Sequence, residues 1–293
     1  RRAHPAIDIR VLNGAMAGTE AELVHHGLIP VLNSLEQVER WSAQSEVVGN
    51  RLPAVLHLDT GMSRLGLAAD EAQQLSEQRW RLDQIEVVHV MSHLASADVP
   101  GSDGPKRQVE LFTNLRSIFS MGTASLANSA GIFLGPTYHF DLARPGIALY
   151  GGNPVPGGRN PMRPVATLES PILQIRNVET GEEIGYGATH VMQHDGRVAT
   201  IGVGYADGYL RSSSNRGEVA IGGVRAPIVG RVSMDLITID VTHVEPADLY
   251  PGAAVEVIGP TCLIDDVAKR ADSIANELLT DLGRRYQVTH LNR

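Results

Sequence analysis

The sequence predicts an α/β protein in two parts, a parallel sheet flanked by helices and then a mostly β part. Residues 1–152 alternate short apolar runs with longer amphipathic stretches, as βα units around a parallel sheet do. Residues 166–293 read mostly as short strands separated by glycine-rich turns. Between these parts, residues 153–165 are rich in proline and glycine, which predicts a linker.

Six strands are expected in the first part, each a short apolar run, with helices of regular apolar spacing between them. A closed parallel barrel of the TIM type needs eight strands. The count leaves two possibilities, an open sheet or a chain that begins two βα units late. The expected strands are residues 8–12, 29–32, 54–58, 86–91, 123–126 and 147–150, and the expected helices are residues 19–26, 35–43, 69–78 and 106–120.

The second part is expected to be a β domain that ends in a helix. Residues 273–285 predict this helix because Ser273 is a candidate N-cap and Ile274, Leu278 and Leu282 have helical spacing. The expected strands are residues 166–177, 197–203, 219–221, 224–229, 236–240 and 254–258.

The composition is that of a globular protein with an acidic balance. Among 293 residues, 33 Asp and Glu oppose 25 Lys and Arg, so the formal net charge is −8, and 43% of the chain is hydrophobic. This charge makes nucleic acid and anionic membranes unexpected partners. We expect a cytoplasmic location, because no run approaches the roughly 20 apolar residues of a membrane span and no signal-peptide pattern opens the chain. A single cysteine, Cys262, excludes an intrachain disulfide and a thiolate metal site, and no metal is expected.

Polar segments follow the expected strands at the points where those strands end. In parallel α/β sheets, functional residues gather just past the carboxyl ends of the strands. A further segment places Arg144 two residues before Gly146, whose bare backbone can approach a phosphate. The four segments are residues 59–66, 92–98, 127–130 and 140–151.

Together these segments resemble the alanine racemase family, pyridoxal-phosphate enzymes whose amino-terminal (β/α)8 barrel is followed by a β-rich domain. The resemblance continues through residues 183–189, 202–208 and 226–235 and spans essentially the whole chain. The ordered recurrence of these segments is more specific than any single motif. It implies a TIM-type barrel followed by a mostly β carboxy-terminal domain. It also implies an isomerase that interconverts L-alanine and D-alanine and so supplies D-alanine for cell-wall peptidoglycan.

The family's first barrel strand ends in a lysine that forms the internal aldimine with the cofactor, followed shortly by a tyrosine that contacts the phosphate. The chain has two lysines, and neither Lys106 nor Lys269 lies in such a motif. We therefore expect that the first two βα units, with the cofactor lysine, are absent from this chain. A chain without that lysine is expected to be catalytically dead as it stands.

Racemisation removes the Cα proton of an amino acid, and the resemblance implies two bases on opposite faces, the cofactor lysine and Tyr205 of the partner subunit. A free phenol, with a pKa of about 10, is a poor base unless nearby cations favour the phenolate. Alternatively, Tyr205 is a half-buried aromatic at a strand end.

The resemblance places Arg144 against the pyridine nitrogen, which it keeps unprotonated, although Arg144 could instead pair with Asp141. His93 is expected near the ring, linking Arg144 to Tyr205, or else it is a satisfied core histidine.

The resemblance also assigns contacts to the phosphate and to the substrate. Ser129, with the backbone amides of Gly146 and Ile147, fits a phosphate cradle, although a hydroxyl after a strand is also a common N-cap. Arg64 is expected to bind the substrate carboxylate.

In the second part, Met234 and Asp235 are expected to form the partner's wall of the pocket through the Met234 amide. For the residues that match the path by which substrate enters, a solvated surface network is the alternative. These residues are Asp98, Tyr186 and Arg231.

Two positions depart from the family pattern. His57 stands where many members carry a lysine modified to a carbamate that holds the substrate-binding arginine, and a neutral histidine cannot supply that negative charge. The orientation of Arg64 is therefore open. Near the carboxy terminus, Arg284, Arg285 and Tyr286 lie where some relatives place a pocket tyrosine.

Other functions remain open at this point. A decarboxylase of the same architecture usually protonates the pyridine nitrogen with a carboxylate, and Arg144 argues against it. A serine racemase differs by one substrate hydroxyl, which a small pocket discriminates weakly. A non-catalytic remnant that binds pyridoxal phosphate is supported by the missing lysine. Because Tyr205 and Met234 would act across a subunit boundary, the resemblance implies a head-to-tail homodimer with shared active sites.

Overall fold

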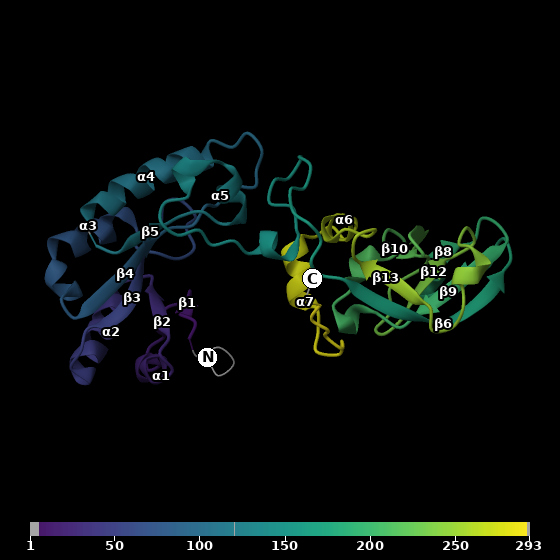
Figure 1. Ribbon diagram of the computed structural model, residues 1–293, viewed down its shortest axis with the longest axis horizontal. Helices are drawn as coiled ribbons and strands as arrows, with labels where there is room; N and C mark the ends of the chain where they lie inside the picture. The colour runs from purple at the N-terminus through teal and green to yellow at the C-terminus, as the bar shows by residue number, and fades with distance from the viewer. Residues whose placement is uncertain (1–5, 120, 292–293) are drawn as a thin grey trace. The chain divides into compact units, whose positions relative to one another are not determined.

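The computed structural model describes residues 6–119 and 121–291 and divides the chain into two compact units (Figure 1). The first unit runs to Gly146 and includes Pro154–Gly158. The second unit consists of Ile147–Asn153 and the chain from Arg159 onward. This division places part of the expected linker in each unit.

The first unit is built on a parallel sheet of five strands in the order β1-β2-β3-β4-β5, and Figure 1 shows the helices on its outer side. The predicted parallel α/β architecture is therefore confirmed. The strands are β1 (Arg10–Val11), β2 (Ile29–Leu32), β3 (Leu52–His57), β4 (Ile85–Met91) and β5 (Thr123–Ser125). The helices are α1 (Glu20–His25), α2 (Leu35–Val48), α3 (Ala69–Glu77), α4 (Gly104–Ile118) and α5 (Ser129–Phe133), with 3₁₀ turns at Arg79–Leu82 and Pro136–Tyr138.

Local capping explains where the helices begin and end. The Ser34 hydroxyl accepts the Gln37 N–H at 3.2 Å at the start of α2, and Gly49 ends that helix with φ 76°. At the start of α3, the Glu71 carboxylate accepts the Ala68 N–H at 3.0 Å. The helix predicted over residues 69–78 is confirmed to within one residue, and the helix predicted over residues 35–43 begins where expected but continues to Val48, where Gly49 ends it.

Both faces of the sheet are buried, and successive residues of β3 point to opposite sides. Ala54 and Leu56 join the larger hydrophobic cluster, which includes helix residues such as Trp41, whereas Val55 packs with Val31 in a smaller cluster. This alternation is what a strand buried on both faces requires. The near-continuous apolar runs that predicted the strands therefore have a physical cause.

The sheet is curled, so that strands distant in sheet order approach each other across its inner face. Arg10 lies on β1 and His89 on β4, and β2 and β3 lie between these strands in the sheet, yet Arg10 Nη2 and His89 Nε2 are 2.7 Å apart. This curvature is the geometry of part of a barrel wall. It gathers the carboxyl ends of the strands around one region.

The predicted strand at residues 147–150 is wrong. Ile147–Tyr150 forms a 3₁₀ turn that belongs to the second unit, closed by the Gly152 N–H donating to the Ile147 carbonyl at 3.2 Å. Gly151 follows with φ 89°, a conformation that bends the chain away from an extended path. The chain pairs with the segment after β5 earlier than predicted, through an isolated parallel β-bridge between Asn128 and Arg144.

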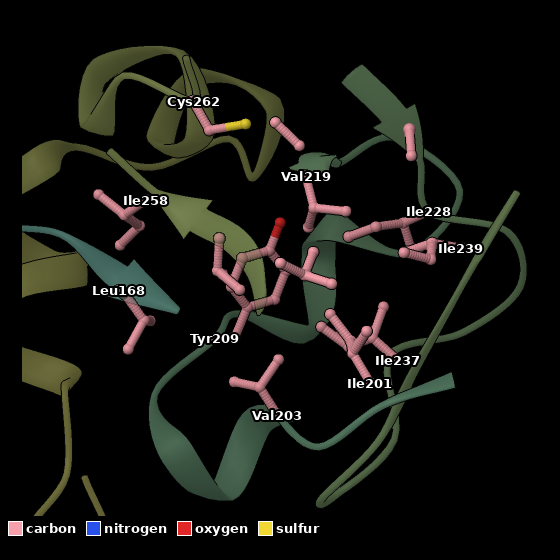
Figure 2. Close-up of a cluster of buried hydrophobic side chains, with 14 of the residues drawn as sticks. Leu168, Ile201, Val203, Tyr209, Val219, Ile228, Ile237, Ile239, Ile258 and Cys262 are labelled. Atoms are coloured by element: carbon pink, nitrogen blue, oxygen red, sulfur yellow. The ribbon is translucent and has the colours of Figure 1, made fainter. Parts of the chain in front are cut away.

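The second unit is built on a six-stranded sheet in the order β11-β10-β13-β6-β9-β12, in which every pair with a defined register is antiparallel. Its core surrounds the buried Tyr209 ring, which lies among Leu168, Val203 and Ile201 (Figure 2). The predicted mostly β part is confirmed. The strands are β6 (Leu168–Val178), β9 (Gly196–Ile201), β10 (Glu218–Ile221), β11 (Val224–Pro227), β12 (Ile237–Asp240) and β13 (Ala254–Ile258), with a β7 (Glu183–Ile184) and β8 (His190–Val191) hairpin. The 3₁₀ turns are Tyr186–Ala188, Tyr205–Asp207, Arg211–Ser213 and Pro246–Asp248.

The helices of the second unit differ from the prediction. The helix predicted over residues 273–285 is only α7 (Ala275–Asp281), because Leu282 leaves the helical region at ψ 111°. A helix that the sequence did not indicate, α6 (Ile264–Arg270), precedes it. Within the part of the chain that the structure describes, no helix combines the length and apolar character that crossing a membrane requires.

Candidate active site

Arg144 is the charged centre of the first unit, at the end of the sheet where the strands finish. Its guanidinium donates to the Ser92 carbonyl at 2.6 Å, to the Leu126 carbonyl at 3.3 Å and to the Ser125 hydroxyl. Burial lowers the pKa of Arg144 to about 10. In the described structure no ion pair joins it to Asp141, whose carboxylate accepts the Ala124 N–H at 2.7 Å. Arg144 is thus a partly buried cation held by neutral acceptors.

His57, the last residue of β3, is buried beside this cation. Its Nδ1 lies 2.7 Å from the Asn33 Oδ1, while the Asn33 amide nitrogen donates to the Val31 carbonyl at 2.8 Å. Since the amide nitrogen is engaged there, the oxygen faces His57, and the His57 Nδ1 must donate. Burial, and then the charge of Arg144, lowers the pKa of His57 to about 4. His57 is therefore neutral at pH 7.

His93 follows β4 and is partly buried. Burial lowers its pKa to about 4, with further lowering from the charges of Arg144 and Arg64. The His93 carbonyl accepts the Gln108 side-chain amide at 2.9 Å. Arg144 and His93 are close enough to interact electrostatically, but no hydrogen bond joins them in the described structure. His93 is also neutral at pH 7.

The loop after β3 is organised by Asp59 and carries Arg64. The Asp59 carboxylate accepts the N–H groups of Gly61 and Met62, both at 2.9 Å, and that of Ser63 at 3.0 Å. Burial alone would raise the pKa of Asp59, but these three donors outweigh it and hold the pKa below its ordinary value. Arg64 is exposed, and its side chain has no hydrogen bond or ion pair with the described residues. It is available to an anion.

Ser129 begins α5, and its hydroxyl accepts the Gly146 N–H at 2.8 Å. The N-cap is the preceding residue, since the Asn128 side chain accepts the Gly131 N–H at 2.9 Å. A Cβ at Gly146 would meet no atom within 4 Å, so the space beside it is open. Ile147 begins the 3₁₀ turn of the second unit, and therefore only Ser129 and Gly146 of the predicted cradle meet within one unit.

Asp98 lies apart from these groups, in the loop between β4 and α4. It is exposed and helps to line a cavity of about 310 Å³ in the first unit, together with Lys106 and Pro154–Pro156. Lys106 is exposed and lies 3.7 Å from Asp103. Neither side chain contacts Arg144.

In the second unit, the structure brings Tyr205 and Met234 together. The Tyr205 N–H donates to the Ser233 carbonyl at 3.0 Å, and the Ala206 N–H donates to the Met234 carbonyl at 2.9 Å. Tyr205 is 42% exposed and Met234 is 54% exposed. The Met234 N–H donates to none of the described residues. The two predicted residues therefore share one exposed surface.

Asp235, the remaining predicted wall residue, is held by Arg285. The Arg285 Nη1 donates to the Asp235 Oδ1 at 2.7 Å, and the Arg285 Nε lies 3.2 Å from the Asp207 Oδ1. The sequence left the role of Arg285 open and did not single out Asp207. The position of Asp207 two residues after Tyr205 was the only feature of the sequence that could have pointed to it.

Tyr186 and Arg231 are neighbours through Gly187. Gly187 has φ 71°, and a Cβ there would lie 3.2 Å from the Arg231 Nη1. Tyr186 is strongly exposed, and Arg231 is exposed. These two residues of the predicted substrate path share one surface of the second unit, whereas Asp98 belongs to the first.

Asn33 is the residue of the first-unit site that sequence reasoning missed. It follows β2 directly, so the rule that selected the segments after β3, β4 and β5 could have found it. Among the residues that the structure describes, no three His, Cys, Asp or Glu side chains gather to hold a metal ion. The first-unit site consists of the partly buried cation Arg144, the neutral His57 and His93, and the exposed Arg64.

Fold and site together define a protein with a barrel-type parallel sheet, a positively charged group of residues at the carboxyl ends of its strands, and a β-rich second part. The alanine racemase N-terminal domain family matches residues 1–154, and the alanine racemase C-terminal domain family matches residues 165–290. The chain belongs to the alanine racemase family and is an isomerase of the racemase class.

Curated relatives and solved structures agree with this assignment. The chain is 47% identical to alanine racemase of Brucella canis over 295 residues, covering 96% of this chain and 74% of the relative. It is 48% identical to alanine racemase of Rhodospirillum rubrum over 276 residues, covering 94% and 74%.

Among solved structures, alanine racemase from Bartonella henselae with covalently bound pyridoxal phosphate matches with a TM-score of 0.90 and 36% identity, covering 96% of this chain and 78% of that one. Biosynthetic alanine racemase from Pseudomonas aeruginosa matches with a TM-score of 0.88 and 31% identity, covering 97% and 79%.

The donor set of the first unit fits a phosphorylated pyridine. The Ser129 hydroxyl and the Gly146 N–H bond each other beside the open space at Gly146, and both are groups that can turn to a phosphate. The partly buried Arg144 has no carboxylate partner among the described residues. The covalent lysine is the missing part of the fit, since Lys106 is exposed in α4 and Lys269 lies in the second unit.

Proposed function

We propose that this protein interconverts L-alanine and D-alanine with pyridoxal phosphate, and that its D-alanine serves the synthesis of cell-wall peptidoglycan. The observation that carries the proposal is the partly buried Arg144, a cation without a carboxylate partner whose charge acts on two neutral histidines, His57 and His93. The names of the relatives and the covalently bound cofactor of the Bartonella henselae structure support it. The cytoplasmic location and the domain limits at residues 152 and 166 stay predictions.

Pyridoxal phosphate would be held by residues of the first unit. Ser129 and Gly146, with Ile147, would bind its phosphate, and Arg144 would meet the pyridine nitrogen, with His93 near the ring. When bound, the cofactor supplies an electron sink for the negative charge left at Cα. A guanidinium does not protonate the pyridine nitrogen, so the sink stays weak, which favours racemisation over decarboxylation.

The chain's own residues would orient the substrate and move its proton. Arg64, free of partners in the described structure, would bind the substrate carboxylate. The Tyr205 phenol oxygen would take or return the Cα proton on one face, and the cofactor lysine would act on the other. Met234 and Asp235 would form the pocket wall through the free Met234 N–H. Asp98, Tyr186 and Arg231 would line the substrate path.

The exposed surface around Tyr205 supports a homodimer with shared sites. Tyr205 and Met234 are half exposed although a proton-transfer site must exclude water. A second copy that covers this surface would complete the site. Mixing Tyr205→Phe subunits with subunits that lack the cofactor lysine tests the arrangement. Some mixed dimers should regain activity, and no recovery despite demonstrated subunit exchange would exclude shared sites.

The function is tested by incubating the protein with L-alanine and pyridoxal phosphate in D2O and following deuterium at Cα by NMR. The intact mass is determined first, so that the preparation is known to carry the cofactor lysine. We expect deuterium exchange at Cα and formation of D-alanine, and loss of both in Tyr205→Phe. L-serine is assayed beside L-alanine, and faster turnover of L-serine would identify a serine racemase. Cofactor binding without exchange would identify a non-catalytic protein, and release of CO2 would identify a decarboxylase.

A further inference from the structure

Tyr205 lies where three separate segments of the second unit meet through their backbones. The Tyr205 N–H donates to the Ser233 carbonyl at 3.0 Å, which joins the Tyr205 turn to residues 233–235. The Gly283 N–H donates to the Asp207 carbonyl at 3.3 Å, which joins the same turn to the segment after α7. The position of Tyr205 therefore depends on how the three segments are held together.

Two glycines permit this close approach. A Cβ at Gly204 would lie 2.3 Å from the Met234 carbonyl oxygen, and one at Gly208 would lie 2.1 Å from the Asp281 carbonyl oxygen. Gly208 also has φ 95°, which residues with a side chain adopt only with strain. The backbones pack directly on each other here, and the junction leaves no room for side chains between them.

A single side chain from the third segment joins the other two. Arg285 Nε lies 3.2 Å from Asp207 Oδ1, and Arg285 Nη1 donates to Asp235 Oδ1 at 2.7 Å. The other oxygen of the buried Asp207 carboxylate accepts the Gly204 N–H at 2.9 Å. The hydrogen bond to Asp235, and then the charge of Asp207, raises the pKa of Arg285. The guanidinium is therefore a permanent cation between two carboxylates.

We propose that Arg285 is a positioning residue for the racemase reaction, acting through Asp207 and Asp235. By holding these carboxylates, it fixes the turn that carries Tyr205 against the loop that carries Met234. The inference rests on the proposed role of Tyr205 as a base. Arg285 itself makes no contact with the reacting atoms.

This role differs from simple stabilisation. Arg285 is 53% exposed, and ion pairs at such positions contribute little to folding stability. The backbone hydrogen bonds of the junction remain when the guanidinium is removed, so the turn shifts and does not unfold. A displacement of a reacting group by about 1 Å, however, can lower a rate by about 10²-fold. Activity should therefore fall much more than stability.

The test compares Arg285→Gln and Arg285→Lys with a matched control, Arg225→Gln. Arg225 also bridges two carboxylates of the second unit, Glu218 at 3.1 Å and Asp266 at 3.6 Å, and is 43% exposed, but it lies on β11. The full-length holoenzyme is used to measure kcat, KM and the primary deuterium isotope effect with each enantiomer of Cα-deuterated alanine. Amide hydrogen exchange is measured over residues 203–209 and 233–236.

We expect Arg285→Gln to lower kcat by about 10- to 100-fold with little change in KM and Tm. The isotope effect should rise for the enantiomer whose Cα hydrogen faces Tyr205 and not for the other, a pattern that a general loss of structure would not produce. Amide exchange should become faster over both segments. Arg285→Lys, which keeps the charge but not the two-pronged geometry, should recover part of the rate.

Two results separate the possible failures. If the wild-type holoenzyme racemises alanine and Arg285→Gln behaves like Arg225→Gln in kcat, isotope effect and exchange, the positioning role is overturned while the proposed function stands. If the wild-type protein does not exchange the Cα proton, the proposed function fails and the positioning role fails with it. In that case, faster amide hydrogen exchange over residues 203–209 in Arg285→Gln would show that Arg285 only stabilises the structure of this turn.

Discussion

The neutral His57 makes the first unit sensitive to acid. Its folded pKa of about 4 lies below the ordinary 6.5, so between these values the unfolded chain binds a proton that the folded protein does not. The stability that His57 contributes is fully present above about pH 6.5 and is lost as the pH falls toward 4. The perturbation we choose is a change from pH 7 to pH 5, in the wild type and in His57→Gln.

The size of the effect follows from the two pKa values. Proton linkage for one such group gives a loss of about 2 kcal/mol in the free energy of unfolding between pH 7 and pH 5. With a urea m-value of about 2 kcal/mol/M, the midpoint should fall by about 1 M. Glutamine at position 57 keeps an N–H donor for the Asn33 oxygen but does not titrate, so this share of the loss should disappear.

Tryptophan fluorescence is the appropriate signal, because both tryptophans, Trp41 and Trp80, lie in the first unit. Urea titrations at pH 7 and pH 5 are compared for the wild type, His57→Gln and the control His25→Gln, which changes an exposed histidine of α1. His93 should keep some acid sensitivity in every variant. If the midpoint of His57→Gln falls as far as that of the wild type, the depressed pKa is not the cause.

Three further changes test the site. Gly66→Ala should lower stability by at least about 1 kcal/mol, since φ is 108° and a Cβ would lie 2.8 Å from the Asp59 nitrogen; a tryptophan-monitored melt measures this, and an unchanged Tm would contradict it. Asp59→Asn should lower the free energy of unfolding by about 1 kcal/mol at pH 7, because the N–H groups of Met62 and Ser63 lose a charged acceptor. The difference in this free energy between the variant and the wild type should vanish in acid, where Asp59 is protonated. Arg144→Met should weaken pyridoxal phosphate binding by about tenfold in an absorbance titration, and equal affinity would remove Arg144 from the cofactor site.

The sequence predicts strands well where turn residues bound them. Residues 29–32 and 254–258 are confirmed to the residue, because Gly27 and Asn33 flank the first and Gly252 and Gly259 flank the second. The strand predicted at 147–150 fails for the opposite reason. The segment is apolar as a strand would be, but Gly151 and Gly152 let the chain close into a turn through the local hydrogen bond from the Gly152 N–H to the Ile147 carbonyl. The apolar spacing alone does not reveal that bond.

The two carboxy-terminal helices show a limit of pattern reading. Helix α6 has too few residues for a periodic signal, with Ile264, Val267 and Ala268 buried and no side-chain cap at its start. For α7, the apolar Leu282 extends the pattern one step beyond the helix, although the backbone has already turned. Short helices take their stability from packing, which the local sequence does not encode.

The candidate site could be predicted at the level of segments but not of bonds. The strand-end rule selects the segments that carry Arg144 and His93, and the structure brings both to one region with His57. The sequence could not indicate that Asn33 fixes the proton on His57, because these two residues are 24 positions apart in the chain. Nor could it indicate that Arg285 joins two carboxylates, since Arg285 and Asp235 are 50 positions apart.

The burial of Arg144 is itself an argument about function. A buried cation is ordinarily paired with a carboxylate, and one held only by neutral carbonyls and a hydroxyl carries a desolvation penalty that the fold does not require. Neither histidine relieves it, since both are neutral and their pKa values are lowered by the same charge. Unrelieved electrostatic strain of this kind persists where a ligand completes the site. The charge of Arg144 adds to the acid sensitivity that burial gives His57. In the proposed function the same charge would meet the pyridine nitrogen, so stability and function would oppose each other at one residue.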